Sequence, residues 1–440
     1  HVAKITAGFT STTVVIDPVS VGNDLVIEGT ENVEITLVAV TNTSPDAGAD
    51  ITIDNANKTA TLAIDDNDSG YLTIAAATNA TEGTTNGKFT ITLRDPSGAP
   101  TTSSTDSQVT YVVTGTAVDG TDFASLPLTA TITAGSSTVD IDVNVMGVFD
   151  DGITEGIETV TVKLINTVVG PTDPDIYVGA IGGPTLTFQQ GVAGYTGTED
   201  VYLDQAVPLT NFDGANMMVN TDAFNVGTNA QHGLLKFGNI IGSGLIPTGA
   251  KIASADLSVW VPFSLLTATG GNISLHQMKT NWNEGLDWAT SAGIGNFTPG
   301  IQTGAGASGD ADIAGIPLTL TEPGIFSPPL QSNVNVTTNV QNWSNGTPNF
   351  GWGLLPTDLV DGTLFLDSES GNPLLRPRLT VTVDTSATIT ITDNDLTVIN
   401  ISGNTPAAEE TTNGIVNVTL TKPLPVGNPS LGLNVILFPL

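Results

Sequence analysis

Short acidic runs recur along this 440-residue chain, each beside a segment in which apolar and polar residues alternate. Three of them are Asp65-Asp66-Asn67-Asp68, Asp150-Asp151 and Asp393-Asn394-Asp395. Calcium takes six to eight oxygen ligands at about 2.3–2.6 Å, and carboxylates are among those it prefers. Asp and Asn are also ordinary residues of β-turns, so a purely structural role stays open. Carboxylates packed at one end of a sheet would repel one another without a cation, and the runs therefore favour calcium binding.

The net charge of −33, from 44 acidic and 11 basic residues, excludes some classes of partner. A surface this negative repels nucleic acid and anionic membranes. It attracts cations, either as a diffuse atmosphere or at specific divalent sites. Solubility or adaptation to salt water would also explain the charge, but neither explains why the acidic residues cluster.

The composition predicts an all-β protein that does not insert into a membrane. Apolar residues, mostly Val, Ile, Leu and Ala, make up 39% of the chain, and 48 Gly and 25 Pro supply many turns. No segment approaches the ~20 apolar residues that a membrane helix needs. The absence of cysteine rules out disulfides, zinc–thiolate sites and thiol nucleophiles.

Patterns typical of catalysis are missing from the sequence. His1, His232 and His276 lie in unrelated contexts, and neither a Gly-x-Ser-x-Gly nor a His-Glu-x-x-His motif occurs. Glu284 and Asp287 could be imagined as the carboxylate pair of a glycosidase, but turn acids explain them better. We therefore expect no enzyme activity.

Three pairs of segments repeat within the chain. Residues 80–93 match 407–420, and both contain an acidic loop, an Asn-Gly turn signal and an alternating strand. Residues 5–37 match 132–164, and residues 60–68 match 387–395. The chain therefore contains parts of at least two copies of one β-domain.

In this order the three blocks resemble the Calx-β domain, which is an immunoglobulin-like, seven-stranded antiparallel β-sandwich. The resemblance covers residues 71–182 and includes Gly120-Thr121-Asp122-Phe123. The strand that would close this copy does not follow residue 182 but lies within residues 384–395. The simplest interpretation is that a second domain, residues 183–383, is inserted into the last hairpin, because loop insertions cost little closure entropy.

The Calx-β resemblance implies calcium ligands in the acidic loops. In the copy formed by 71–182 and 384–395, the matching positions are Glu82, Asp122, Asp150, Asp151, Glu155 or Glu158, Asp393 and Asp395. In the second, split copy they are Asp24, Glu28, Glu31, Asp65, Asp66 and Asp68, joined by Glu409 or Glu410 from a neighbour.

The split copy has its strands at the two ends of the chain. Residues 1–70 hold only the later strands of a Calx-β-like unit, and residues 396–440 hold only the first ones. Neither part can close a sandwich alone, so each would leave a bare sheet edge and an apolar face. In one explanation, the tail of one subunit completes the head of the next by strand complementation, and a head-to-tail homopolymer grows. In the other, the chain is a window from a longer covalent repeat array.

The inserted region, 183–383, contains all five tryptophans. Its segments 188–200, 234–237, 246–261, 340–347 and 376–381 resemble, in order, the DNRLRE-type domain of secreted bacterial and archaeal proteins. That resemblance implies a jelly-roll-like β-sandwich related to carbohydrate-binding modules, with a polysaccharide as a second partner. Exposed aromatic rings could stack on sugars, although aromatic residues also pack in sandwich cores. The candidates for stacking are Trp282, Trp288, Tyr195 and Tyr202.

Taken together, these patterns predict tandem β-sandwiches in a secreted structural or adhesive protein at the cell surface or in the matrix. It would form, or belong to, a calcium-stabilised filament, sheath or surface fibre, with other copies of itself as its main partner. The alternative is a carbohydrate-binding accessory region of a larger secreted enzyme or adhesin.

Overall fold

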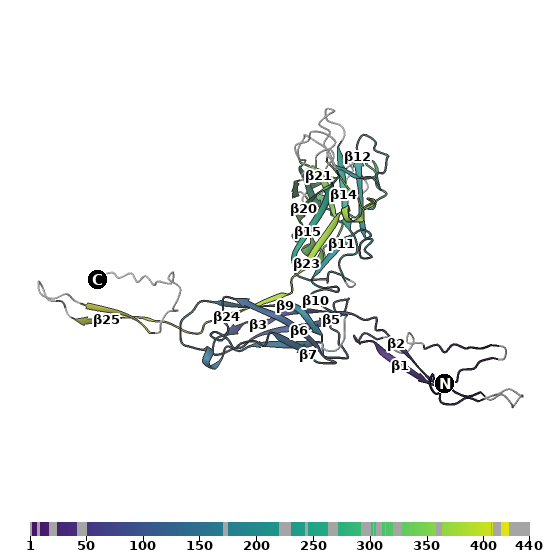
Figure 1. The fold of residues 1–440 in the computed structure, drawn as a ribbon. Helices are drawn as coiled ribbons and strands as arrows, with labels where there is room; N and C mark the ends of the chain where they lie inside the picture. The colour runs from purple at the N-terminus through teal and green to yellow at the C-terminus, as the bar shows by residue number, and fades with distance from the viewer. Residues whose placement is uncertain are drawn as a thin grey trace.

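The computed structural model contains two β-sandwiches and two separate strand pairs (Figure 1). The structure describes residues 2–421 except 7–8, 17–23, 42–50, 170–174, 220–229, 243–244, 263–271, 292–300, 302, 305–309, 313, 320–327, 358–362, 406 and 408–414. The fold-class prediction is confirmed, because strands in several sheets make up nearly all of the regular structure. Among the described residues, no helix combines the length and the apolar composition needed to cross a bilayer.

The axial sandwich, formed by residues 70–178 and 386–392, has a four-stranded and a five-stranded sheet. In the first sheet the order is β10 (Ile176–Val178), β3 (Gly70–Thr78), β5 (Gly87–Arg94) and β8 (Thr138–Val143). In the second it is β4 (Ala80–Thr81), β24 (Ser386–Thr392), β9 (Glu158–Val169), β6 (Ser107–Gly115) and β7 (Thr129–Ile132). A short 3-10 turn, η1 (Gly147–Phe149), follows β8.

Strict alternation of side chains builds the core of the axial sandwich. Along β5, Phe89, Ile91 and Leu93 are fully buried, while the residues between them face outward. From the opposite sheet, Val160 of β9 and Ile389 of β24 pack into the same core. Strand β24 therefore belongs to the axial sandwich although the whole inserted region precedes it in the chain.

The inserted sandwich, residues 185–383, has its own core. One sheet has the order β11 (Thr185–Gln189), β23 (Arg378–Val383), β15 (Ile252–Val261) and β20 (Leu330–Asn335). The other has β12 (Thr198–Asp204), β14 (Gln231–Phe237), β21 (Trp352–Pro356), β16 (Asn272–Gln277) and β19 (Ile316–Thr319). Smaller elements are β13 (Met217–Val219) with β22 (Thr363–Phe365), β17 (Thr303–Gly304) with β18 (Ala311–Asp312), the helix α1 (Thr337–Ser344) and the 3-10 turn η3 (Pro373–Leu375).

The inserted sandwich projects sideways from the axial sandwich on a short neck (Figure 1). Its first and last strands, β11 and β23, pair with each other, and the Val383 amide donates to the Pro184 carbonyl at 2.7 Å. The Lys251 ammonium contacts the Asp384 carboxylate at 2.6 Å, and the buried Thr385 hydroxyl donates to the Leu164 carbonyl at 2.8 Å. The neck is therefore closed by hydrogen bonds on both sides.

One strand pair lies beyond each end of the axial sandwich (Figure 1). The N-terminal strand pair consists of β1 (Glu31–Thr36) and β2 (Thr59–Ile64), and the C-terminal strand pair of β25 (Ile399–Thr405) and β26 (Ile415–Leu420). The N-terminal side is joined to the axial sandwich by Ile27, whose side chain is fully buried in the axial core. The Ile27 amide donates to the Thr102 carbonyl, and the Ile27 carbonyl accepts from the Ser104 amide, both at 2.9 Å.

Candidate metal centre

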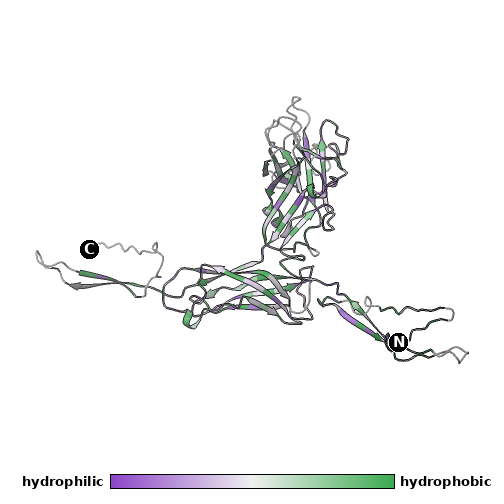
Figure 2. Cartoon of the chain, in the orientation of Figure 1, coloured by the Kyte–Doolittle hydropathy of each residue, from purple (hydrophilic) through white to green (hydrophobic). Residues whose placement is uncertain are grey.

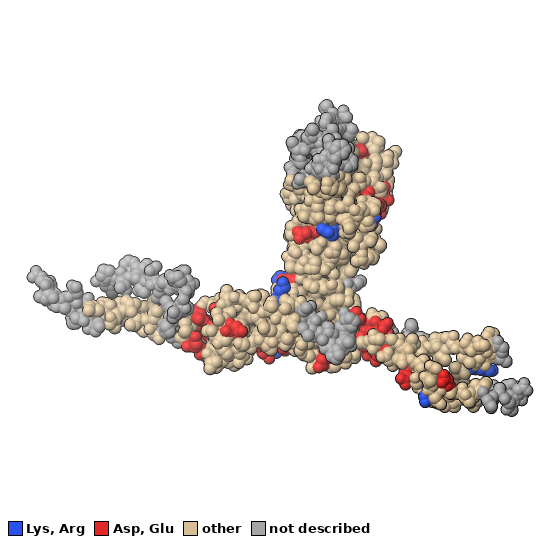
Figure 3. All heavy atoms as spheres, in the orientation of Figure 1, with Lys and Arg blue, Asp and Glu red and all other residues tan. Residues whose placement is uncertain are grey.

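The carboxylates predicted for the axial copy meet at the end of the axial sandwich that leads into the C-terminal strand pair. They come from the turn after β4, the loop after β6, the loop after η1, the start of β9 and the end of β24. Figure 3 shows acidic side chains gathered at this end and at the opposite end, where the N-terminal strand pair is attached. Loops from both sheets therefore contribute to one acidic pole.

Glu82 is positioned by backbone pairing between the edge strand β4 and its neighbour β24. Strand β4 runs parallel to β24, with Ala80 beside Ile391 and Thr81 beside Thr392. The Glu82 amide then donates to the Thr392 carbonyl at 3.0 Å, and the Asn394 side-chain amide donates to the Glu82 carbonyl at 2.7 Å. These bonds hold the Glu82 carboxylate inside the pole, where the residue is 4% exposed.

Asp393 organises the loop at the end of β24. One carboxylate oxygen accepts from the Glu155 amide and the other from the Asp395 amide, each at 2.6 Å. Carboxylate oxygens of Glu82, Asp393 and Asp395 all lie within 4.8 Å of one another. These three residues form the first triad, and it offers the hard oxygen ligands that calcium prefers.

A second triad consists of Asp122, Glu155 and Glu158, whose carboxylate oxygens also lie within 4.8 Å of one another. The Asp122 carboxylate accepts from the Val118 amide at 2.5 Å, which fixes its loop against the pole. Glu158 is the first residue of β9 and points inward, in phase with the core residues Val160 and Val162. The Glu155 amide donates to the Asp393 carboxylate at 2.6 Å, so the two triads adjoin each other.

The electrostatics of the pole favour a positively charged occupant. Burial, reinforced by the charges of Asp393, Glu155, Asp151 and Asp150, raises the pKa of Glu82 to about 7. Burial, followed by a hydrogen bond to Asp122, raises the pKa of Glu158 to about 8. Without a cation, the carboxyl groups of Glu82 and Glu158 are therefore partly protonated near neutral pH. A divalent cation would remove that need by neutralising the carboxylates.

Asp150 and Asp151 flank the first triad without belonging to it. Asp151 accepts from the Ile153 amide at 2.8 Å, and the Asp150 carboxylate lies against Gly83. Gly83 has a φ of +64°, and a Cβ at this position would collide with the Asp150 carboxylate. Glycine is therefore required both by the backbone conformation and by the close approach of a charged group.

The split copy repeats part of this geometry at the N-terminal joint, where Ile27 connects the N-terminal strand pair to the axial sandwich. The Asp66 carboxylate accepts from the Glu28 amide at 2.7 Å and from the Asp68 amide at 3.1 Å, as Asp393 does from Glu155 and Asp395. Asp24, Glu31 and Asp65 are exposed around it. The charges of Glu31, Asp24, Asp66 and Asp68 add to a burial effect that raises the pKa of Glu28. Glu409 and Glu410 lie outside the described residues.

A third acidic triad lies in the inserted sandwich and was not predicted as a metal site. Asp213, Glu284 and Glu369 have carboxylate oxygens within 4.8 Å of one another. They come from three loops that share no repeat or spacing, so nothing in the sequence indicated that they would meet. The buried carboxylate of Asp200 lies beside them and accepts from the Ser368 amide at 2.8 Å.

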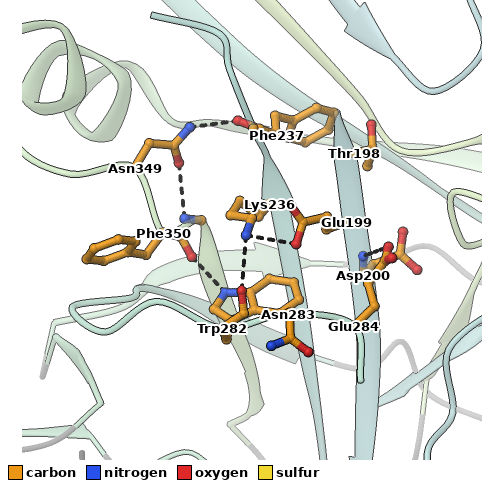
Figure 4. A network of polar contacts seen from close by, with 12 residues as sticks. Thr198, Glu199, Asp200, Lys236, Phe237, Trp282, Asn283, Glu284, Asn349 and Phe350 are labelled. Carbon is orange, nitrogen blue, oxygen red and sulfur yellow. Dashed lines mark hydrogen bonds and ion pairs between the residues drawn. The ribbon is translucent and has the colours of Figure 1, made fainter. Parts of the chain in front are cut away.

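The two tryptophans predicted to stack on sugars are buried instead of exposed. Trp282 is 4% and Trp288 is 8% exposed, and both pack in a small core with Val201 and Leu234. The expected exposure of the two rings was wrong. Lys236, itself buried, covers the Trp282 ring at 4.9 Å while it pairs with Glu199 at 2.8 Å (Figure 4). The Trp288 ring packs beside the His232 ring, with the ring centroids 5.1 Å apart. The Trp282 indole also donates to the Phe350 carbonyl at 2.8 Å.

The two tyrosines of the same prediction are half-buried in aromatic contacts. Tyr195 packs edge-on against Phe188 and donates its hydroxyl to the Gly238 carbonyl at 2.9 Å. Tyr202 stacks on Phe212 with ring centroids 4.2 Å apart. Both rings therefore already have protein partners on one face or edge.

No protein-family model and no curated protein matches the chain. Among solved structures, the crystal structure of CBD12 from CALX1.2 matches over 46% of this chain and 65% of that chain, at 13% identity. The match thus spans less than two-thirds of that structure. Its TM-score is 0.17, so this likeness supports no conclusion about the fold or the function of the chain.

Proposed function

We propose that this chain is an extracellular, non-catalytic structural protein in a filament, sheath or surface fibre, and that calcium bound at its acidic poles stabilises the joints between sandwiches. The observation that carries the proposal is the pair of contiguous carboxylate triads at the end of the axial sandwich. These triads and the acidic group around Asp66 each lie where one β-unit leads into the next, so a cation there would fix the angle between the two units.

Head-to-tail strand complementation is the mode of growth that we propose for this fibre. Both strand pairs expose apolar residues, and each lies at an opposite end of the axial sandwich (Figure 1). A contact of this kind between identical chains does not close on itself and therefore extends into a filament.

The metal part of the proposal is tested by calorimetric titration of the whole chain with calcium and, separately, with magnesium. We expect heat of binding and a rise in Tm with calcium, and a weaker response to magnesium, which demands a tighter octahedral site. The double variant E82Q/D393N should lose both signals. The control D142N removes an exposed acid of β8 that lies beside Lys88 and should leave them unchanged. Absence of heat and of a Tm shift with millimolar calcium would refute this part.

The alternative, a carbohydrate-binding accessory region of a larger secreted protein, has less support. Its two tryptophan candidates are buried, and its two tyrosine candidates already contact other aromatic rings. Retention of the chain on a polysaccharide affinity gel would restore this alternative.

A further inference from the structure

The N-terminal strand pair has the same register as two strands of the axial sandwich. In the N-terminal pair Glu31 lies opposite Ile64, and Val33 opposite Leu62. In the axial sandwich the repeat-related residues pair identically, with Glu158 opposite Ile391 and Val160 opposite Ile389. The N-terminal pair is therefore the equivalent of β9 and β24, which belong to the five-stranded sheet.

The C-terminal strand pair has the same register as two strands of the four-stranded sheet, β3 and β5. Ile399 lies opposite Leu420 and Ile401 opposite Val418, as Leu72 lies opposite Leu93 and Ile74 opposite Ile91 in β3 and β5. Even the irregularity is repeated, since the register shifts after Gly403 in one pair and after Ala76 in the other. The two pairs are thus equivalents of strands that face each other across one core.

The inner faces of both strand pairs are exposed, whereas the equivalent faces in the axial sandwich are buried against a second sheet. Val416 is 56% exposed, whereas its equivalent Phe89 is fully buried. Leu62 is 51% exposed, whereas Ile389 is fully buried. Figure 2 shows apolar residues along both pairs, on strands that pack against no second sheet among the described residues. Leaving such faces in water is unfavourable, because each apolar side chain gains free energy on burial.

Because the two pairs lie at opposite ends of the axial sandwich, they cannot cover each other within one chain (Figure 1). We propose that the C-terminal strand pair of a second copy of this chain seats on the N-terminal strand pair of the first, face to face. The register is that of the axial sandwich, so Val416, Val418 and Ile399 enter one core with Leu62 and Val33. This inference rests on the proposed fibre function, and it adds the two surfaces that meet and how they are aligned.

The axial sandwich also specifies which backbone positions become neighbours. Ala80 of β4 lies beside Ile391 of β24 in a parallel ladder. The repeat-related residues are Ala407 and Ile64, so these two positions come together between copies. A disulfide requires Cα atoms about 4.4–6.8 Å apart, which adjacent positions on paired strands provide.

The test uses single-cysteine variants of the whole chain, which contains no native cysteine. I64C is mixed with A407C under mild oxidation, and the products are separated on non-reducing gels. The matched control replaces I64C with T61C, on the same strand but with its side chain in the opposite phase. We expect a disulfide-linked dimer of the two variants, at about tenfold the yield of the control mixture, because reach depends steeply on Cβ geometry.

Two outcomes would overturn the inference. Equal cross-linking of I64C and T61C would mean random collision, and no cross-linking of either, in samples that light scattering shows to be multimeric, would mean that other surfaces meet. Calcium titration of the same samples is independent of both readouts. A chain that binds calcium but does not cross-link would therefore retain the metal part of the proposed function and lose the docking arrangement.

Discussion

At the scale of single residues, the acidic pole is a set of charges whose protonation depends on the fold. The pKa of Glu82 rises from 4.5 to about 7 and that of Glu158 from 4.5 to about 8, chiefly through burial. A raised carboxyl pKa means that the folded state binds protons more tightly than the unfolded chain. The resulting stabilisation is complete below about pH 4.5 and is lost as the pH rises through 7 to 8.

The calcium-free protein should therefore become less stable between pH 5 and pH 8.5. We expect Tm, measured calorimetrically in a chelating buffer, to fall across this range. With saturating calcium the fall should shrink or reverse, because the metal binds the deprotonated ligands. A Tm that is independent of pH in the chelating buffer would contradict the raised pKa values of Glu82 and Glu158.

The substitution E82Q distinguishes a role of Glu82 as a calcium ligand from a purely structural role. Above about pH 7 it removes a buried negative charge, and it keeps the hydrogen bonds of the residue 82 backbone to Thr392 and Asn394. We expect the calcium-free variant to be as stable as the parent protein or more stable, since repulsion falls. Its affinity for calcium should fall by about tenfold or more, equivalent to ~1.4 kcal/mol. Lower stability of E82Q in the absence of calcium would instead indicate a structural role for the carboxylate.

Sequence reasoning located acidic residues of the axial pole because repeats and turn positions carry that information. Glu82, Asp122, Glu155, Glu158, Asp393 and Asp395 come together in two triads. The burial of Trp282 was not predictable from its polar neighbours, because it depends on Lys236 and Phe350, which are distant in the sequence. The trio Asp213, Glu284 and Glu369 was missed for the same reason.

At the scale of elements, the two joints of the axial sandwich differ in the pair of residues that meet there. At the N-terminal joint Ile27 fills a space beside Gly70 and Leu93 in the axial core. At the C-terminal joint the repeat-related position is Thr154, which contacts the Thr397 hydroxyl. The first joint is thus held by apolar packing and backbone hydrogen bonds, and the second by a polar contact beside the acidic pole.

Ile27→Ala should loosen the N-terminal joint. Truncating a fully buried isoleucine to alanine costs ~2–5 kcal/mol of unfolding free energy, so we expect the Tm of the axial sandwich to fall. The Glu28 amide, which donates to the Asp66 carboxylate, should also exchange its hydrogen faster. Ile27→Val is the matched control and should cost ~0.5–1.5 kcal/mol. Equal stability of Ile27→Ala and the parent protein would show that the joint does not depend on this side chain.

The strand registers were largely predictable, because alternation and repeats define which residues face inward. The return of the chain from the inserted region to β24 also followed from the repeat at 387–395. The sequence held no comparable signal for Ile27, whose burial depends on Thr102 and Ser104 in a loop far along the chain.

At the scale of the whole molecule, fibre growth should depend on burial of the apolar inner faces of the two strand pairs. The double substitution V416D/V418D places charges on the inner face of the C-terminal strand pair. We expect it to leave calcium binding by the axial pole intact while light scattering and negative-stain microscopy show monomers. The control T419D changes an outward-facing residue of β26 and should still form fibres. Monomers for T419D as well would indicate a general charge effect.

Removal of calcium should act on the joints and not on the seating of strands. We expect parent fibres treated with a chelator to bend more strongly in micrographs, measured as a shorter persistence length, and to stiffen again when calcium is restored. Unchanged curvature after chelation would place any calcium effect elsewhere than at the joints.

The neck of the inserted sandwich has a mechanical consequence. Its two connections leave the axial sandwich side by side and are bonded to each other through Val383 and Pro184. In the proposed fibre, tension would enter the axial sandwich at Gly70 and leave at the end of β24, which is paired with β9 along six residues. The side domain stands outside this line of force. Its surface would keep its shape while the rod beneath it is stretched, so the projecting domain would still present the same surface to whatever it contacts.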